Sequence, residues 1–239
     1  MSGQPPSDPG FEGRAPEPGE LPPASGAWRE GDPPGHRQFA DIGHVMLERG
    51  GMLDVRLAYE TWGHLNAAAD NGVLVLHALT GDSHIRGPAG PGHPTAGWWT
   101  DLIGPGAPID TDRWFVVAPN ILGGCQGSTG PASLAPDGKP YASRFPYLTI
   151  RDTVAAELAL ADQLGIDQWA AVIGGSLGGN RVLEWAAMAP DRVRAIVPIA
   201  TSAQTTADQI AWAHAQVQAI QADPAFRGGE YYGAPPGGG

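Results

Sequence analysis

Short continuous apolar runs recur along this chain, bounded by glycine, proline or polar residues. Each run has the length of a buried strand. The runs occupy residues 73–76, 114–119, 169–173 and 193–199. Strands of a parallel sheet are covered on both faces and are therefore apolar throughout, so we interpret these runs as parallel strands.

Three other segments carry the three-to-four-residue spacing of amphipathic helices. The first begins at Thr149, a good N-cap residue, and ends at Gly165. The second ends before Pro190, and the third covers residues 207–222. Strands that alternate with helices predict a mostly parallel sheet flanked by helices, which is the α/β class.

An antiparallel hairpin is predicted ahead of the parallel strands. Residues 45–47 and 53–61 are strand-like, and they are joined across Arg49, Gly50 and Gly51. This position favours a hairpin at the edge of the sheet.

The first part of the chain has a different composition. Residues 1–37 are rich in proline, glycine and acidic side chains, and they carry too little apolar surface to offset the entropy of ordering. We therefore expect a disordered leader over residues 1–37 and an α/β core over residues 38–239. A proline-rich tail that binds a partner is the alternative for the leader.

Residues 168–185 combine a strand, a tight turn and a helix around one serine. Gly174, Ser176 and Gly178 fit the G-x-S-x-G nucleophile elbow, in which a strained strand-to-helix turn exposes the serine hydroxyl. A glycine-rich structural turn is the alternative, but the strand before and the helix after it favour a nucleophile. The elbow and the preceding hairpin together predict the α/β hydrolase fold.

A serine nucleophile needs a base, which in this fold is a histidine that follows the serine and an acid along the chain. Only His214 follows Ser176, and it lies inside the third predicted helix. We interpret His214 as a helix-surface residue and expect no catalytic base in this chain.

The parts of an oxyanion hole are present. One donor is the N–H of Leu177, and the other belongs to residues 77–81, which follow an earlier strand. We interpret His77 as a hydrogen-bonded turn residue rather than a catalytic group. The glycine-rich loop at residues 123–131, which contains Cys125, lacks the lysine of a phosphate-binding loop.

Composition narrows the possible partners. A net charge of −11 argues against nucleic acid and anionic membranes. No apolar run approaches the roughly 18 residues that span a bilayer, and we see no secretory signal. Cys125 is the only cysteine, so an internal disulfide is impossible. We expect a cytoplasmic protein with small-molecule partners and, because no His, Cys, Asp or Glu grouping has metal-ligand spacing, no metal.

Several motifs together resemble the homoserine O-acetyltransferases, in particular the actinobacterial members. The similarity covers about residues 38–236, and the ordered set HALTG, GGCxGSTGP and GGSxGG is more specific than the elbow alone. The matching segments are LAYETWG (57–63), HALTGDSH (77–84), the tryptophan pair at 98–99, residues 110–131 and 139–152, GGSLGG (174–179), and residues 222–226 and 228–232.

The resemblance implies a ping-pong acetyl transfer in methionine biosynthesis. Ser176 would take the acetyl group from acetyl-CoA, a substrate rather than a resident cofactor, and pass it to the side-chain hydroxyl of L-homoserine. The N–H groups of Leu79 and Leu177 would hold the oxyanion, and Cys125 would belong to a loop near the pocket. The complete protein would be a homodimer.

Two departures from the family pattern matter. Leu177 stands where members usually carry methionine, which leaves the working backbone N–H in place. The family's lid and last strands, with the catalytic aspartate and histidine, would lie beyond Gly239, so we expect the N-terminal portion of such an enzyme, nearly inactive by itself. The alternatives are a serine hydrolase, a transferase for succinyl groups or another hydroxyl amino acid, and an inactive CoA-binding module.

Overall fold

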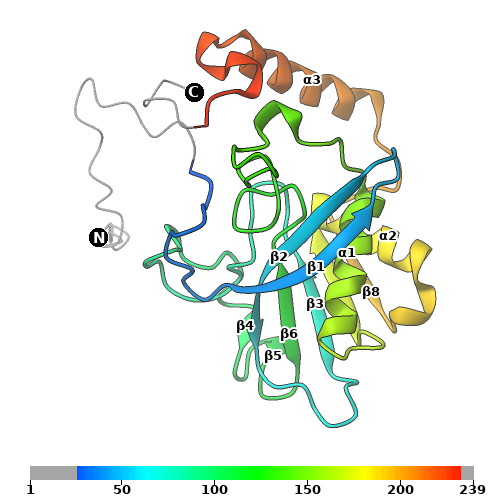
Figure 1. Cartoon of the computed structure of the whole chain (residues 1–239). Coiled ribbons are helices and arrows are strands. Elements are labelled where there is room, and N and C mark those ends of the chain that lie inside the picture. The colour runs from blue at the N-terminus through cyan, green and yellow to red at the C-terminus, as the bar shows by residue number, and fades with distance from the viewer. Residues whose placement is uncertain (1–25, 233–239) are drawn as a thin grey trace, which may run out of the picture.

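The computed structural model describes residues 26–232, and Figure 1 shows how they are arranged around one main sheet. The strands are β1 (Gln38–Met46), β2 (Met52–Trp62), β3 (Gly72–Leu76), β4 (Ile103–Gly104), β5 (Ile109–Asp110), β6 (Phe115–Pro119), β7 (Ala171–Gly175) and β8 (Ile196–Ile199). The helices are α1 (Ile150–Gln163), α2 (Leu177–Met188) and α3 (Ala207–Ala222), with 3-10 turns η1 (Ala142–Arg144), η2 (Pro190–Arg192) and η3 (Pro224–Gly229). The three predicted helices are confirmed, whereas β4 and β5 form a small second sheet that no apolar run predicted.

The main sheet has the strand order β1-β2-β6-β3-β7-β8. β1, β2 and β6 pair in antiparallel fashion, whereas β6, β3, β7 and β8 are parallel to one another. A mostly parallel sheet with an edge hairpin is therefore confirmed. The carboxyl ends of the parallel strands point upward in Figure 1, and this is the edge at which α/β proteins place their functional groups.

The strand β3 is covered on both faces. Leu74 and Leu76 belong to the larger core, which β1, β2, α1 and α2 help to build. Val73 and Val75 point to the other face, where they pack with Ile85 and other apolar residues from the segment around β4 and β6. This alternation is the period-two geometry of a strand, and burial on both sides explains why the run at 73–76 is apolar throughout.

A buried ion pair joins α1 to α2. Arg181 donates to Glu157 Oε1 from Nε at 2.8 Å and also from Nη2, and Trp185 Nε1 donates to Glu157 Oε2 at 2.7 Å. All three side chains are at most 2% exposed. Because α2 begins directly after Ser176, this pair anchors the helix that carries the predicted nucleophile.

Residues 26–37 pack against the core, so the disordered leader expected over residues 1–37 needs a correction for this part. Trp28 packs on Phe39 with ring centroids 5.0 Å apart, and the Trp28 backbone N–H donates to the Cys125 carbonyl at 2.8 Å. Arg37 is 5% exposed and donates to Gln126 Oε1 at 2.7 Å. The average composition of the segment does not reveal these few anchoring side chains. Residues 1–25 lie outside the described residues.

The last strand is a second correction. The run at 193–199 was expected to be a buried strand, but β8 is shorter, and Ile196, Val197 and Ile199 are 36–42% exposed. The physical reason is its place at the end of the strand order, where only β7 pairs with it. The apolar run therefore predicted that a strand forms here, but not whether other elements bury it.

Helix α3 is exposed on all sides. None of its residues is buried, although Ile210, Val217 and Ile220 occupy the predicted apolar positions. In Figure 1 it lies above the carboxyl edge of the sheet. Within residues 26–232, no helix combines the length and the apolar character needed to cross a membrane.

Candidate active site

Ser176 adopts the backbone conformation expected of a nucleophile elbow. Its φ of 52° and ψ of −117° are sparsely populated for a residue with a side chain, and such strain points to a functional role. The conformation is held from behind, because the Ser176 N–H donates to the Ile199 carbonyl at 2.9 Å. The side chain is exposed at the start of α2. The geometry therefore suits a nucleophile, and the catalytic role itself remains a prediction.

The glycines on both sides of Ser176 are required by close backbone contacts. A Cβ on Gly178 would lie 2.0 Å from the Leu76 carbonyl oxygen, and a Cβ on Gly174 would lie 2.6 Å from the Gly178 carbonyl. Both separations are far below van der Waals contact. The pattern G-x-S-x-G therefore lets α2 start directly against the end of β3.

The two predicted oxyanion donors lie at the same edge of the sheet. Leu76, the last residue of β3, is the register partner of Gly174 in β7, so the loop at 77–81 and the elbow leave neighbouring strands. Leu177 is the first residue of α2, where backbone N–H groups have no partner within the helix and the helix dipole favours negative charge. Leu79 as a whole is 76% exposed, so the residue lies at the surface of this edge.

His77 lies close to the elbow but both of its ring nitrogens are occupied. Its Nε2 is 3.0 Å from the Ile121 N–H, and its Nδ1 is 2.7 Å from the Ala78 carbonyl oxygen. Burial, with a smaller contribution from the Arg181 charge, lowers the pKa of His77 to about 3. A neutral ring with both nitrogens engaged does not serve as the base for Ser176, which agrees with its interpretation as a turn residue.

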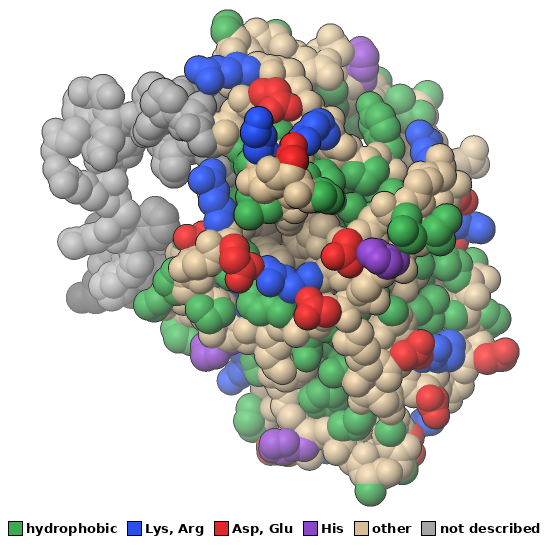
Figure 2. Space-filling view, viewed as in Figure 1, with side chains coloured by type: hydrophobic (Ala, Val, Ile, Leu, Met, Phe, Trp, Pro, Cys, Tyr) green, Lys and Arg blue, Asp and Glu red, His purple; other side chains and the backbone are tan. Residues whose placement is uncertain are grey.

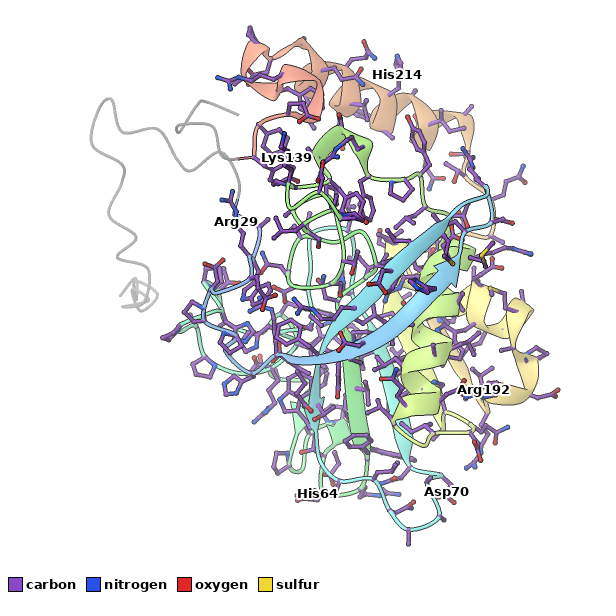
Figure 3. All side chains as sticks on the ribbon, viewed as in Figure 1. Arg29, His64, Asp70, Lys139, Arg192 and His214 are labelled. Atoms are coloured by element: carbon purple, nitrogen blue, oxygen red, sulfur yellow. The ribbon has the colours of Figure 1, made fainter. Side chains whose placement is uncertain are left out.

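His214 and His64 lie in other parts of the fold. Figure 3 shows His214 on α3 and His64 at the opposite end of the sheet. No hydrogen bond joins the Ser176 hydroxyl to a histidine within residues 26–232. The described part of the chain therefore holds the elbow and the two candidate donors without a base for the serine.

Three buried residues bring metal-ligating atoms together, which sequence spacing did not reveal. Atoms of Glu60, His84 and His93 lie within 4.8 Å of one another. The rings of His84 and His93 are stacked with centroids 3.8 Å apart and planes inclined by 14°, so their in-plane lone pairs cannot converge on one ion. Glu60 instead accepts hydrogen bonds from Ser83 Oγ and His84 Nδ1, both at 2.9 Å. We interpret the cluster as a link between β2 and the loop after β3.

His93 completes this cluster from a distant loop. Its Nε2 accepts the His36 N–H at 2.9 Å, and burial lowers its pKa to about 4. This bond holds the N-terminal segment against the core. A spacing motif could not have found this cluster, because β2 and the two loops meet only in the folded chain.

A cavity of about 830 Å³ lies beside the hairpin and the glycine-rich loop. Cys125, Arg56, Trp28 and Tyr141 are among its lining residues, and Ser176 is not. Figure 2 shows the hollow on the face turned to the viewer, with acidic and basic side chains around it. Cys125 is exposed and belongs to this cavity, so the structure does not bring it together with the elbow.

The sheet, the flanking helices and the strained serine together define an α/β hydrolase. The family model described as the alpha/beta hydrolase fold matches residues 71–237, and the chain belongs to this family. The more specific resemblance read from the motifs is also confirmed. The homoserine O-acetyltransferase of Thermobifida fusca is 63% identical over 215 residues, which are 89% of this chain and 57% of that protein.

Two solved structures give a similar picture. Homoserine O-acetyltransferase from Bacillus anthracis matches with a TM-score of 0.77 at 31% identity, over 84% of this chain and 56% of that one. Esterase E22 matches with a TM-score of 0.76 at 33% identity, over 82% of this chain and 55% of that one. The chain thus spans a little over half the length of the relatives it matches.

Proposed function

We propose that this chain forms the nucleophile-bearing part of an acyltransferase that moves an acetyl group from acetyl-CoA to the side-chain hydroxyl of L-homoserine. The observation that carries the proposal is the strained, exposed Ser176 at the start of α2. The 63% identical relative named homoserine O-acetyltransferase supports the choice of reaction. With that reaction come the further proposals of methionine biosynthesis, a cytoplasmic location and a homodimer.

The first half-reaction would load Ser176. Its Oγ attacks the thioester carbonyl, the bond from carbon to sulfur breaks, and CoA leaves after its sulfur takes up a proton. Charge on the carbonyl oxygen would rest on the N–H groups of Leu177 and Leu79, in the way that preorganised donors stabilise an oxyanion. The N-terminal dipole of α2 adds to this stabilisation.

The second half-reaction would remove the acetyl group from Ser176. The L-homoserine hydroxyl attacks the acetyl ester, the bond to Ser176 Oγ breaks, and the serine regains its proton while O-acetylhomoserine leaves. A general base must carry these protons. We assign that role to a histidine of the complete protein outside residues 26–232, because His77 has both ring nitrogens engaged.

A serine esterase is the second candidate, because esterase E22 matches this chain about as well as the solved homoserine O-acetyltransferase does. Both activities share the acyl-enzyme and differ in the acceptor. Excluding water from the acyl-enzyme favours transfer, and admitting water favours hydrolysis. The elbow and its donors serve either outcome equally.

The decisive experiment starts from the natural gene product, isolated from its source cells. Its intact mass is compared with the 24.8 kDa of this chain. The protein is then mixed with acetyl-CoA, and mass spectrometry locates the acetyl group, which we expect on Ser176. Addition of L-homoserine should release O-acetylhomoserine and restore the unmodified serine.

The variant Ser176→Ala should lose at least about 10³-fold in transfer, since the nucleophile is then absent. Ser133→Ala, in the cavity loop, is the matched control and should keep its activity. Undiminished transfer by Ser176→Ala would contradict the assignment. Transfer only from succinyl-CoA would overturn the donor, release of acetate faster than transfer to L-homoserine would favour the esterase, and CoA binding without acylation would favour a binding module.

A further inference from the structure

We infer that His77 is a positioning residue that aims the Leu79 N–H toward the acyl oxygen, and this inference rests on the proposed function. His77 is 2% exposed at the end of β3, two residues before the predicted donor. It has no contact with the reacting atoms. Its effect would pass through the peptide group that joins Ala78 to Leu79.

The hydrogen bonds of His77 determine its tautomer. The Ile121 N–H can only donate, so the Nε2 atom 3.0 Å away must accept and carries no proton. The Ala78 carbonyl can only accept, so the Nδ1 atom 2.7 Å away must carry the proton. One neutral tautomer therefore satisfies both bonds, and protonation of Nε2 would break the bond to Ile121.

The bond from Nδ1 restrains a peptide plane. The Ala78 carbonyl oxygen accepts both from His77 Nδ1 and from the Gly81 N–H, the latter at 3.0 Å. The described residues contain no cis peptide bond, so the N–H of Leu79 points opposite to this carbonyl. Two donors that draw the carbonyl into the turn thereby turn the Leu79 N–H outward.

The Leu79 N–H is unpaired within the described part of the chain. Among residues 26–232, no backbone hydrogen bond is donated by Leu79. The same carboxyl edge carries Ser176, because the Leu76 and His77 carbonyls lie against Gly178 of the elbow helix. A preorganised, unpaired donor at this edge has the properties that an oxyanion hole requires.

The second bond of His77 explains why a histidine suits this position better than a shorter amide. Through Nε2 the ring also holds Ile121, which follows β6. The carboxyl ends of β3 and β6 are thus joined by one rigid side chain. Asparagine can replace only the Nδ1 donor and glutamine only the Nε2 acceptor, so these two variants separate the two bonds.

The first test measures the tautomer in this chain, without any assay. Labelling the imidazole nitrogens with ¹⁵N should show a neutral ring protonated at Nδ1 throughout pH 5–8. A ring protonated at Nε2, or one that titrates in that range, would overturn the inference. This result does not depend on the substrate, so it stands even if L-homoserine is not the acceptor.

The second test compares acyl transfer and amide exchange in three variants of the natural gene product. His77→Leu should lower kcat by about 10²–10³-fold, the range for loss of one oxyanion donor, with a much smaller change in KM. His77→Asn should keep most of the wild-type kcat, because its side-chain N–H can replace the Nδ1 donor, while the Ile121 amide becomes exchangeable. His77→Gln should protect the Ile121 amide and still lose transfer.

The inference would be overturned if His77→Gln kept its kcat and His77→Asn lost it. Activity would then depend on the bond to the Ile121 N–H, and the role of His77 would be merely structural. Undiminished kcat in His77→Leu would overturn it as well. His64→Leu is the matched control, since His64 is exposed at the far end of the sheet. If the wild type acylates Ser176 but does not use L-homoserine, the proposed function fails. The His77 variants are then compared by their rates of Ser176 acylation, so the inference is still tested.

Discussion

Helices α1 and α3 begin with the same local chemistry and end in opposite environments. Thr149 starts α1 and Thr206 starts α3, and each is the threonine of a complete capping box. Half of the residues in α1 are buried, including Glu157, whereas none is buried in α3. Capping therefore defines where a helix starts, whereas packing partners decide what the helix contributes to stability.

The largest loss of stability is expected where the buried helix α1 contacts α2. Arg181→Met leaves the Glu157 carboxylate buried beside Trp185 alone, and such a loss costs about 3–5 kcal/mol of unfolding free energy. Urea denaturation measures the change. Asp162→Asn is the control, because the Asp162 side chain is 65% exposed and its ion pair with Arg192 should contribute about 0–1 kcal/mol.

A small loss in Arg181→Met would contradict the anchoring role of the pair. The double variant Arg181→Met with Glu157→Leu removes both charges, and it should recover part of the lost stability because no unpaired charge remains. No recovery would mean that the arginine acts through its packing rather than through its charge.

The second expected effect is a pH dependence that separates buried from exposed histidines. His77 has a pKa of about 3 in the folded protein against 6.5 when unfolded, so between these values the unfolded state binds more protons. The contribution of His77 to the unfolding free energy is fully present above pH 6.5 and is lost as pH falls toward 3. Because of His77, the unfolding free energy should drop by about 2 kcal/mol between pH 7 and pH 5.

Urea denaturation at the two pH values gives the difference for the wild type and for His77→Leu, in which the drop should shrink. His93, whose pKa is lowered to about 4, contributes in the same direction and remains in both proteins. His214→Leu on α3, where no residue is buried, is the control for replacing a histidine by leucine. An equal drop in His77→Leu and the wild type would contradict the buried neutral state of His77.

The smallest expected effect tests the two caps directly. Thr149→Ala removes an acceptor for the Asp152 N–H and should cost about 1 kcal/mol, because α1 unfolds together with the core. Thr206→Ala makes the same change at α3 and should alter the global unfolding free energy by at most a few tenths of a kcal/mol. Denaturant unfolding compares them, and equal losses would show that α3 is part of the cooperative core.

Local motifs made much of the fold and the elbow predictable. Gly174, Ser176 and Gly178 lie within five residues of one another, so the G-x-S-x-G spacing could be read directly from the sequence, although the contact of Gly178 with the Leu76 carbonyl comes from a distant strand. Thr149 with Asp152 could be read for the same reason. The oxyanion donors followed from the position of Leu177 and from the resemblance, and their catalytic roles remain predictions.

Other features had no local signal. Glu60, His84 and His93 come from β2 and two loops, and only the strand pairing brings them together. The anchoring of residues 26–37 depends on a few side chains such as Arg37 in a proline-rich segment. Apolar spacing predicted β8 and α3 correctly as elements, but a pattern along the chain does not contain the neighbour that would cover them.

The three helices, most strands of the main sheet, the cap at Thr149 and the sharp turn around Ser176 could all be predicted from the sequence alone. These properties depend on dihedral preferences and on contacts within a few residues. Only the tertiary structure decided that Arg181 lies buried on Glu157, that α3 is exposed, and that His77 holds one tautomer between Ala78 and Ile121. These outcomes depend on atoms that are distant in the chain and meet only when the sheet is assembled.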